Sequence, residues 1–244
     1  MRFEKFKSHI FYMDTTDLIS QNYAIIVAGG SGTRMQAAIP KQFLLLSGKP
    51  VLMHTLTAFH NCLSKPELIL ALHADFHAYW VQLCIDYDFT VPHTLVAGGE
   101  TRFHSVKKGL AAVPDDKGAI VAVQDAVRPL TDAAIIDASF SHATAHGNAI
   151  VAVKSRDSIR QGNNNHSVSL LRDEIYLVQT PQTFQSVQLK KAYEQPYNSG
   201  FTDDASVVEQ SGVTINLIEG NYRNIKITFP EDIAIAELLL GKSS

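Results

Sequence analysis

A glycine-rich segment that also carries two cationic residues follows the first apolar run of the chain. Residues 24–27 read Ala-Ile-Ile-Val, and the sequence continues Ala-Gly-Gly-Ser-Gly-Thr-Arg-Met before Pro-Lys-Gln-Phe. The glycines of this loop are Gly29, Gly30 and Gly32. Small residues let backbone N–H groups approach an anion closely. Because Arg34 and Lys41 stand on the same loop, the segment predicts a polyphosphate ligand.

Two better-known phosphate-binding motifs are excluded by the residues that follow these glycines. A P-loop needs Gly-Lys-Ser/Thr after its second glycine, whereas a threonine and Arg34 follow Gly32. A dinucleotide-binding fingerprint needs a third glycine and an acidic residue about 20 positions further on. Met35 stands in place of that glycine, and the first acidic residue after it is Glu67. An ordinary glycine-rich turn is the structural alternative, which the two cations disfavour.

The composition indicates a chain that folds around a sizeable core. Apolar residues make up 45% of the 244 residues and charged residues 18%. A net charge of −3 gives no general attraction to nucleic acid or membranes, so any phosphate binding must be local. Cys62 and Cys84 favour free thiols in a reducing compartment. Residues 1–21 lack the apolar run of a secretory signal or membrane span, so we expect a cytoplasmic protein.

Strand-like and helix-like segments alternate along the rest of the chain. Apolar, β-branched runs occupy residues 24–27, 68–72, 94–97, 119–123 and 148–153. Helical spacing occurs between them, over residues 51–62, 75–87, 102–113 and 132–146. This alternation predicts an α/β fold with a mostly parallel sheet flanked by helices on both faces. In such sheets ligands bind beyond the carboxyl ends of the strands, so the residues that follow each strand are the candidates for a site.

The alternation stops at residues 154–172, which are polar and contain Gln-Gly-Asn-Asn-Asn-His at their middle. Two short arms around this turn predict a protruding β-hairpin, and a mobile loop is the alternative. A hairpin with so little apolar content needs a surface to lie on, which a second subunit would provide. Strands then resume near residues 175–178 and 213–218, and helices near residues 189–193, 203–210 and 230–240. We expect a flexible extension over residues 1–21 and a single domain over residues 22–244.

Polar residues follow two strands in the first half of the chain. The third strand is followed by a glycine turn and the start of a helix, with Gly99, Glu100, Arg102 and Ser105. A helix N-terminus favours an anion or a carbonyl-rich ring, although a capped turn is the structural alternative. Asp125 and Arg128 follow the fourth strand, where they could hold a sugar hydroxyl or a metal and clamp a phosphate. A purely structural Asp–Arg pair is the alternative there.

Further polar residues stand later in the chain. Thr180 ends a strand in Thr-Pro-Gln, and Thr202 is a candidate N-cap for the helix that starts at Asp203. Lys226 lies between two isoleucines on an expected short strand, so its side chain points away from theirs, toward solvent or an anion. The ten histidines lack metal-ligand spacing such as His-Glu-x-x-His, and no Gly-x-Ser-x-Gly is present. The sequence therefore predicts neither a histidine metal site nor acyl-transfer chemistry.

Together these stretches resemble the methylerythritol-phosphate cytidylyltransferase family of non-mevalonate isoprenoid biosynthesis. The resemblance covers roughly residue 23 to the C-terminus, in five stretches that keep the family's order: residues 28–35 with 40–43, 98–105, 125–129, 180–184 with 202–206, and 224–228. It implies a Rossmann-like nucleotidyltransferase fold and a homodimer clasped by the hairpin arm. It also implies cytidylyl transfer from CTP to methylerythritol 4-phosphate with release of pyrophosphate. The implied cofactor is Mg²⁺, bound mainly through the CTP phosphates, with Asp125 as a possible ligand.

The resemblance also assigns roles to individual residues. The nucleotide would lie against Ala28, Gly29, Gly30, Gly32, Gly99, Glu100, Arg102 and Ser105. The catalytic residues would be Arg34 and Lys41, which stabilise the transition state, together with Arg172 and Lys226, which grip the incoming phosphate. The other substrate-binding residues would be Asp125, Arg128, Ser158, Thr180 and Thr202. Ser158 and Arg172 would reach across from the partner's arm.

Two departures from the family's usual pattern affect the substrate side. Ser158 replaces a threonine, and Gln124 and Val127 replace a histidine and an alanine. Neither departure removes a charge that the chemistry needs. Two other interpretations stay open: a cytidylyltransferase that uses ribitol 5-phosphate, and a non-catalytic nucleotide-binding module. The nucleotide half does not discriminate between the two alcohol phosphates, whereas retention of Arg34 and Lys41 disfavours the non-catalytic module.

Overall fold

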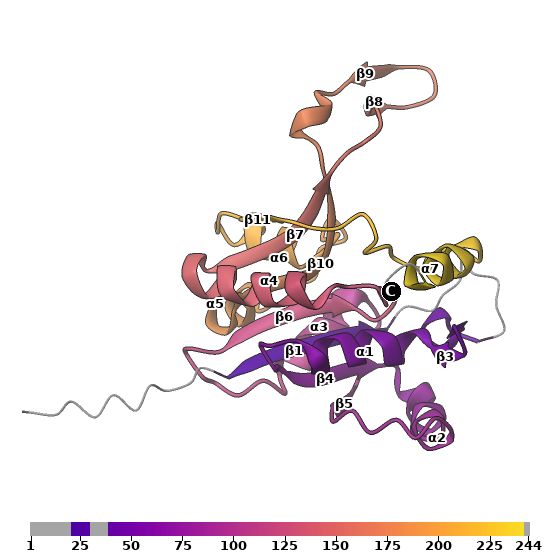
Figure 1. The fold of residues 1–244 in the computed structure, drawn as a ribbon. Helices are drawn as coiled ribbons and strands as arrows, with labels where there is room; N and C mark the ends of the chain where they lie inside the picture. The colour runs from indigo at the N-terminus through magenta and orange to yellow at the C-terminus, as the bar shows by residue number, and fades with distance from the viewer. Residues whose placement is uncertain (1–20, 30–38, 242–244) are drawn as a thin grey trace, which may run out of the picture.

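A seven-stranded sheet forms the centre of the computed structural model, which describes residues 21–29 and 39–241 (Figure 1). The strand order is β11-β7-β10-β6-β1-β4-β5. These strands are β1 (Asn22–Ala28), β4 (Glu67–Leu72), β5 (Thr94–Ala97), β6 (Ile120–Asp125), β7 (Asn148–Lys154), β10 (Tyr176–Gln185) and β11 (Leu217–Glu219). Within this sheet only β10 is antiparallel to its neighbours, β6 and β7. The mostly parallel α/β sheet expected from the sequence is confirmed.

Two layers of helices cover the sheet because the side chains of each strand alternate between its faces. Ala24 and Ile26 of β1 pack with α1 (Val51–Asn61), α2 (His77–Asp86) and α4 (Ala133–His146). Ile25 and Val27 pack on the other face with α3 (Arg102–Leu110), α5 (Ser186–Ala192) and α6 (Asp204–Gln210). Both cores are therefore built from alternate residues of the same strands.

Shorter elements complete the fold. They are the 3₁₀ turns η2 (Lys41–Phe43), η3 (Ala74–Phe76) and η4 (Arg172–Glu174), the strands β2 (Leu45–Leu46), β3 (Lys49–Pro50), β8 (Arg160–Gly162) and β9 (Ser167–Ser169), and the last helix α7 (Glu231–Gly241). A third, smaller core joins α7 to the start of α1 through Val51, Val127, Ile227 and Ala236. No helix within the described part of the chain is long and apolar enough to cross a membrane.

The polar segment between β7 and β10 contains a small antiparallel pair, β8 with β9. Figure 1 shows this pair standing well away from the central sheet. Lys154 at the end of β7 pairs with Tyr176 at the start of β10, so the segment leaves and rejoins the sheet at one edge. Because β7 runs parallel to β6, this is also the edge at which β6 ends.

Three local expectations are wrong. Strand β10 does not end at Thr180 but continues to Gln185, because pairing with β7 resumes at Gln182 after a register shift. The N-cap of α6 is Asp203 and not Thr202, since the Asp203 carboxylate accepts the N–H of Ser206 in a capping box. Residues 224–228 form no strand: within the described chain their backbone makes one backbone–backbone hydrogen bond to the segment just after β6, from Ile227 N–H to the Val127 carbonyl.

Candidate functional site

A cleft of about 630 Å³ lies at the carboxyl ends of β1, β4, β5 and β6. The predicted residues that line it are Ala28, Gly29, Lys41, Gly99, Glu100, Arg102, Asp125 and Lys226. Parallel strands place their carboxyl ends at the same edge of a sheet, which is why segments so distant in sequence meet here. Gly30, Gly32 and Arg34 lie outside the described residues.

The glycine turn after β1 lies against the start of α3. A Cβ atom at Gly29 would stand 2.5 Å from Oγ of Ser105, so no larger residue fits without a shift. Ser105 is fully buried, accepts the N–H of Gly99 at 3.0 Å and donates to the Thr101 carbonyl at 2.9 Å. The two glycine turns therefore both lie against one hydroxyl group, at one wall of the cleft.

Lys41 is positioned by the two residues that follow it in η2. Gln42 is buried, and its Nε2 donates to the carbonyl oxygen of Ala28 at 3.0 Å. Phe43 is also buried and makes an edge contact with the ring of Tyr79, with ring centroids 5.1 Å apart. A lysine side chain on its own is flexible, but here its backbone is tied directly to the end of β1.

Asp125, the last residue of β6, lies among three cationic side chains. Its Oδ1 lies 3.3 Å from Nε of Arg102, and its Oδ2 lies 2.8 Å from Nζ of Lys226. Nε of Arg128 is 3.6 Å from the same Oδ2. Arg102 also donates to a second buried carboxylate, that of Asp204, at 2.6 Å. Three cations therefore share two carboxylates, so the ion-paired groups carry an excess of one positive charge, and Asp203 places a further carboxylate on the wall of the adjoining pocket.

The charges of this cluster fix its protonation states. Burial raises the pKa of Asp125, but Arg102, Lys226 and Arg128 outweigh it and hold this pKa well below its ordinary value. Burial lowers the pKa of Arg102, whereas Asp204 and Asp125 raise it well above the usual arginine value. At neutral pH the carboxylate is ionised and the guanidinium is charged, so the positive excess persists.

A second pocket, of about 240 Å³, adjoins the cleft and shares Arg102, Asp125 and Lys226 with it. Its other lining residues come from β10, from the segment before α6 and from the loop after β6. They include Arg128, Gln179, Thr180, Gln182, Thr202 and Asp203. The Asp125 cluster therefore lies between the cleft and the second pocket, and Arg102 and Lys226 line both of them.

Ser158 and Arg172 are not brought into this site within the single chain. Ser158 is exposed in the segment that leads to β8, and Arg172 is exposed in η4, 3.8 Å from the carboxylate of its neighbour Asp173. Neither lines the cleft or the second pocket. Figure 1 shows the segment that carries them extending away from the sheet.

Several lining residues escaped sequence analysis. His73 and Asp75, just after β4, line the cleft, and Gln179 lines the second pocket. His73 directly follows a strand, which is the position where site residues are expected, but the sequence around it matches no known motif. Gln179 gave no signal, and Asp204, although it lies in the stretch 202–206, received no role, because both roles depend on how α6 and β10 pack against β6.

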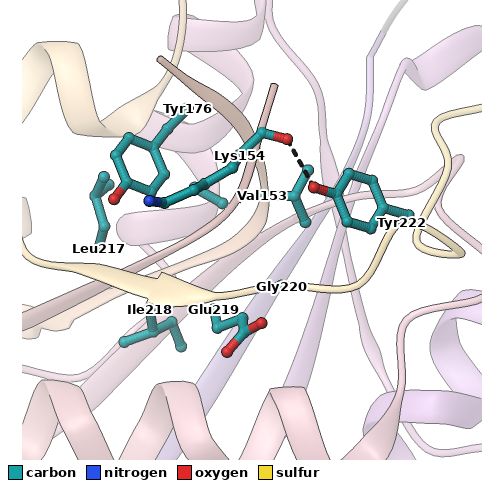
Figure 2. A pocket seen from close by; sticks show the side chains of 9 residues that line it. Val153, Lys154, Tyr176, Leu217, Ile218, Glu219, Gly220 and Tyr222 are labelled. Carbon is teal, nitrogen blue, oxygen red and sulfur yellow. Dashed lines mark hydrogen bonds between the residues drawn. The ribbon is translucent and has the colours of Figure 1, made fainter. Parts of the chain in front are cut away.

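A further hollow of about 410 Å³ lies at the root of the protruding segment, between β7, β10 and β11 (Figure 2). In it Lys154 lies beside Tyr176, and the Tyr222 hydroxyl donates to the Lys154 carbonyl at 2.8 Å. This hollow shares no residue with the cleft or the second pocket. It is therefore separate from the Asp125 cluster.

Comparison with known proteins gives one consistent result. Residues 23–242 match the family described as IspD, 2-C-methyl-D-erythritol 4-phosphate cytidylyltransferase. Relatives with that name include one from Porphyromonas gingivalis, 50% identical over 221 residues, which are 90% of this chain and 98% of the relative. One from Bacteroides thetaiotaomicron is 47% identical over 216 residues, 88% of this chain and 98% of the relative.

Solved structures agree. The 4-diphosphocytidyl-2C-methyl-D-erythritol synthase of Anaerococcus prevotii has a TM-score of 0.78 at 27% identity, over 91% of this chain and 96% of that one. The 2-C-methyl-D-erythritol 4-phosphate cytidylyltransferase of Francisella tularensis has a TM-score of 0.74 at 32% identity, over 90% of this chain and 100% of that one. The likeness therefore spans the cleft, the second pocket and the sheet that carries them.

Proposed function

This chain belongs to the 2-C-methyl-D-erythritol 4-phosphate cytidylyltransferase family, and we propose that its two adjoining pockets divide that family's substrates between them. The reaction itself follows from membership. The enzyme transfers the cytidylyl group of CTP to 2-C-methyl-D-erythritol 4-phosphate and releases pyrophosphate, in the biosynthesis of isoprenoid precursors. The positions of the substrates and the roles of the residues are the proposal.

CTP occupies the larger cleft in this proposal. Its base and ribose lie against the turn before α3, and its phosphates lie against the turn after β1. The residues assigned to it are Ala28, Gly29, Gly30, Gly32, Gly99, Glu100, Arg102 and Ser105. The support is that Gly29 and Gly99 both line the cleft and that both turns lie close to Ser105.

The alcohol phosphate occupies the smaller pocket beyond Asp125. The observation that carries this assignment is the presence of three cationic side chains, Arg102, Arg128 and Lys226, on the walls of this pocket. A phosphate dianion entering from this side meets Lys226, while Thr180 and Thr202 are polar partners on the other walls. Asp125 and Arg128 complete the substrate contacts from the end of β6.

No general base is needed for the transfer, because the attacking phosphate oxygen is already ionised near pH 7. The obstacle is repulsion between the phosphate dianion and the triphosphate, together with charge that builds up as pyrophosphate leaves. Preorganised cations reduce both contributions. Arg34 and Lys41 stabilise the α-phosphoryl group in this proposal, and Lys226 holds the incoming phosphate.

Mg²⁺ bound to the phosphates of CTP would, in this proposal, neutralise part of the triphosphate charge. Among the described residues no group of three or more His, Cys, Asp or Glu side chains is placed to hold a metal ion. Both carboxylate oxygens of Asp125 face cationic side chains, which makes this residue a poor ligand for a further cation. We therefore assign the metal to the nucleotide phosphates.

The protruding segment of about residues 154–172 is proposed as the arm of a homodimer. Ser158 and Arg172 line neither pocket of their own chain, whereas the alcohol-phosphate pocket opens at the edge from which the arm departs. Each chain would then lend these two residues to its partner's site. Residues 22–244 form one domain in this proposal, and residues 1–20, on which the expected extension falls, lie outside the described part of the chain. The free thiols of Cys62 and Cys84 support a reducing, cytoplasmic location.

Pyrophosphate release measured with CTP and each of two alcohol phosphates tests this function. Methylerythritol 4-phosphate is expected to support rapid release and ribitol 5-phosphate little or none. Preference for ribitol 5-phosphate would contradict the substrate assignment. CTP binding without release on either compound would favour the non-catalytic module.

A further inference from the structure

A fully buried asparagine, Asn224, joins the segment that carries Lys226 to the rest of the site. Its Nδ2 donates to the carbonyl oxygen of Thr180 at 2.9 Å and to Oε1 of Gln179 at 3.2 Å. Its Oδ1 accepts the hydroxyl of Thr131 at 3.0 Å. Its backbone carbonyl accepts Nη1 of Arg128 at 2.7 Å. One residue thus contacts β10, the loop after β6 and a cation of the cluster.

This attachment matters because residues 224–228 form neither helix nor strand. Only two buried anchors flank Lys226 in this stretch: Asn224 on one side, and Ile227, whose N–H bonds the Val127 carbonyl at 2.9 Å, on the other. The Lys226 side chain itself is 41% exposed, so packing does little to fix it. Its direction follows from the backbone that these anchors hold.

Thr180 links both partners of the Lys226–Asp125 ion pair. Its hydroxyl accepts the backbone N–H of Asp125 at 3.1 Å, while its carbonyl accepts the Asn224 amide. Loss of the Asn224 side chain leaves a buried carbonyl and the Thr131 hydroxyl without these bonds, and frees the lysine-bearing backbone to shift relative to β6. The network therefore acts directly on the separation between Lys226 and Asp125.

We infer that Asn224 is a positioning residue for the alcohol phosphate, acting through Lys226 and without touching the substrate. The inference rests on the proposed role of Lys226 as the grip on that phosphate. Asn224 holds the lysine at the boundary between the two pockets, so that its ammonium group meets the phosphate dianion in the orientation needed for attack.

The test is a double-mutant cycle with Asn224→Ala, Lys226→Ala and both together. For each protein, kcat/KM for methylerythritol 4-phosphate is measured at saturating CTP, and KM for CTP is measured separately. Asn224→Ala is expected to lower kcat/KM for the alcohol phosphate about tenfold and to leave KM for CTP nearly unchanged. In the Lys226→Ala background, Asn224→Ala should lower kcat/KM hardly any further, because the lysine through which Asn224 acts is absent.

Matched variants separate positioning from stability. Asn148 is equally buried and hydrogen-bonded, donating to the Thr214 carbonyl and accepting the Asn216 N–H, but lies at the opposite edge of the sheet. Asn148→Ala should lower the melting temperature and leave both substrate constants unchanged. If Asn224→Ala fails to fold, Asn224→Ser takes its place. This variant keeps a short polar side chain, and its loss in kcat/KM should likewise disappear in the Lys226→Ala background.

The two levels of the proposal fail differently. An unchanged kcat/KM in Lys226→Ala would overturn the role of Lys226 and, with it, this inference. A large effect of Lys226→Ala combined with equal losses from Asn224→Ala in both backgrounds would overturn the positioning role alone. Equal weakening of CTP and alcohol phosphate by Asn224→Ala would overturn it too, because a general loss of structure would then explain the result.

Discussion

The ammonium nitrogen of Lys226 lies 2.8 Å from Oδ2 of Asp125, at the carboxyl end of β6. The two residues come from distant parts of the chain, and their ion pair stands where the larger cleft meets the smaller pocket. Arg102 and Arg128 approach the same carboxylate, so one negative charge organises three cations. In our proposal, this arrangement prepares a site for a doubly charged phosphate before the phosphate arrives.

Lys41→Ala is expected to reduce turnover while the fold survives. Its backbone is fixed by Gln42 and Phe43, so the truncated side chain removes a cation without loosening η2. Loss of one preorganised group that stabilises the transition state typically costs ~10²–10³ in rate. Steady-state kinetics and a thermal melt check this. Lys49→Ala, which alters an exposed lysine on β3, serves as the control; unchanged turnover in Lys41→Ala would remove Lys41 from the mechanism.

Asp125→Asn should change how stability depends on pH. The pKa of Asp125 in the folded chain lies well below the unfolded value of about 3.9. The ionised carboxylate therefore contributes its full stabilisation of the fold above about pH 4, and this stabilisation is lost as the pH falls from there toward the folded pKa. At pH 7 the variant leaves the buried cations without their shared counter-charge, at a cost of about 3–5 kcal/mol.

Urea unfolding of both proteins at neutral pH and between pH 4 and 3 measures this difference. The gap in unfolding free energy should be largest at neutral pH and should narrow below about pH 4, because the Asp125 carboxyl of the unfolded chain takes up a proton there while the ion-paired carboxylate of the folded chain stays ionised. A gap that is constant with pH would show that Asp125 is not held ionised by its neighbours.

Gly29→Ala should destabilise the protein through a single contact. The added methyl would lie 2.5 Å from Oγ of Ser105, whose hydroxyl is committed to Gly99 and Thr101. Overpacking of this kind costs about 1–3 kcal/mol. Ser105→Ala in the same chain should recover part of the loss, since the nearest remaining side-chain atom of residue 105 is then 3.4 Å away. Additive losses of melting temperature would contradict this contact.

Mixing two inactive variants tests whether sites are shared between chains. Arg34→Ala removes a cation of the nucleotide half, and Arg172→Ala removes one from the arm. In a mixed dimer one of the two sites would regain an intact nucleotide half and an intact partner arm. Free exchange of subunits should then restore about a quarter of wild-type activity. No recovery after confirmed exchange would argue that each chain works alone.

Much of the fold could be predicted from the sequence because strand faces impose a period of two. Ala24 and Ile26 enter one core, and Ile25 enters the other, which is what the apolar run before the glycines indicates. The same rule gave a wrong prediction for the segment around Lys226, which is not a strand. Two flanking isoleucines favour a strand, but the only ladder-like bond there is that of Ile227, and the buried side chain of Asn224 fixes the segment instead.

Site residues could be predicted from the sequence only where they belong to a recognisable motif. The glycines, Asp125 and Lys226 belong to recognisable stretches, and Gly29, Asp125 and Lys226 line one cleft. The pairing of Arg102 with Asp204 depends on the packing of α3 against α6, and no local pattern encodes that distance. Tertiary contacts of this kind explain why Gln179 was not found from the sequence, and why Asn224, inside the stretch 224–228, received no role.

The central proposal is that CTP binds in the larger cleft and the alcohol phosphate in the smaller pocket. Its most direct test is a structure of the enzyme with methylerythritol 4-phosphate and an unreactive CTP analogue. The decisive measurement is the distance from the bound alcohol phosphate to Nζ of Lys226. We expect the phosphate within ion-pair distance of Lys226 in the smaller pocket, with the nucleotide against Gly99 and Ser105 in the cleft. A phosphate bound away from Lys226, or a nucleotide in the smaller pocket, would contradict the account.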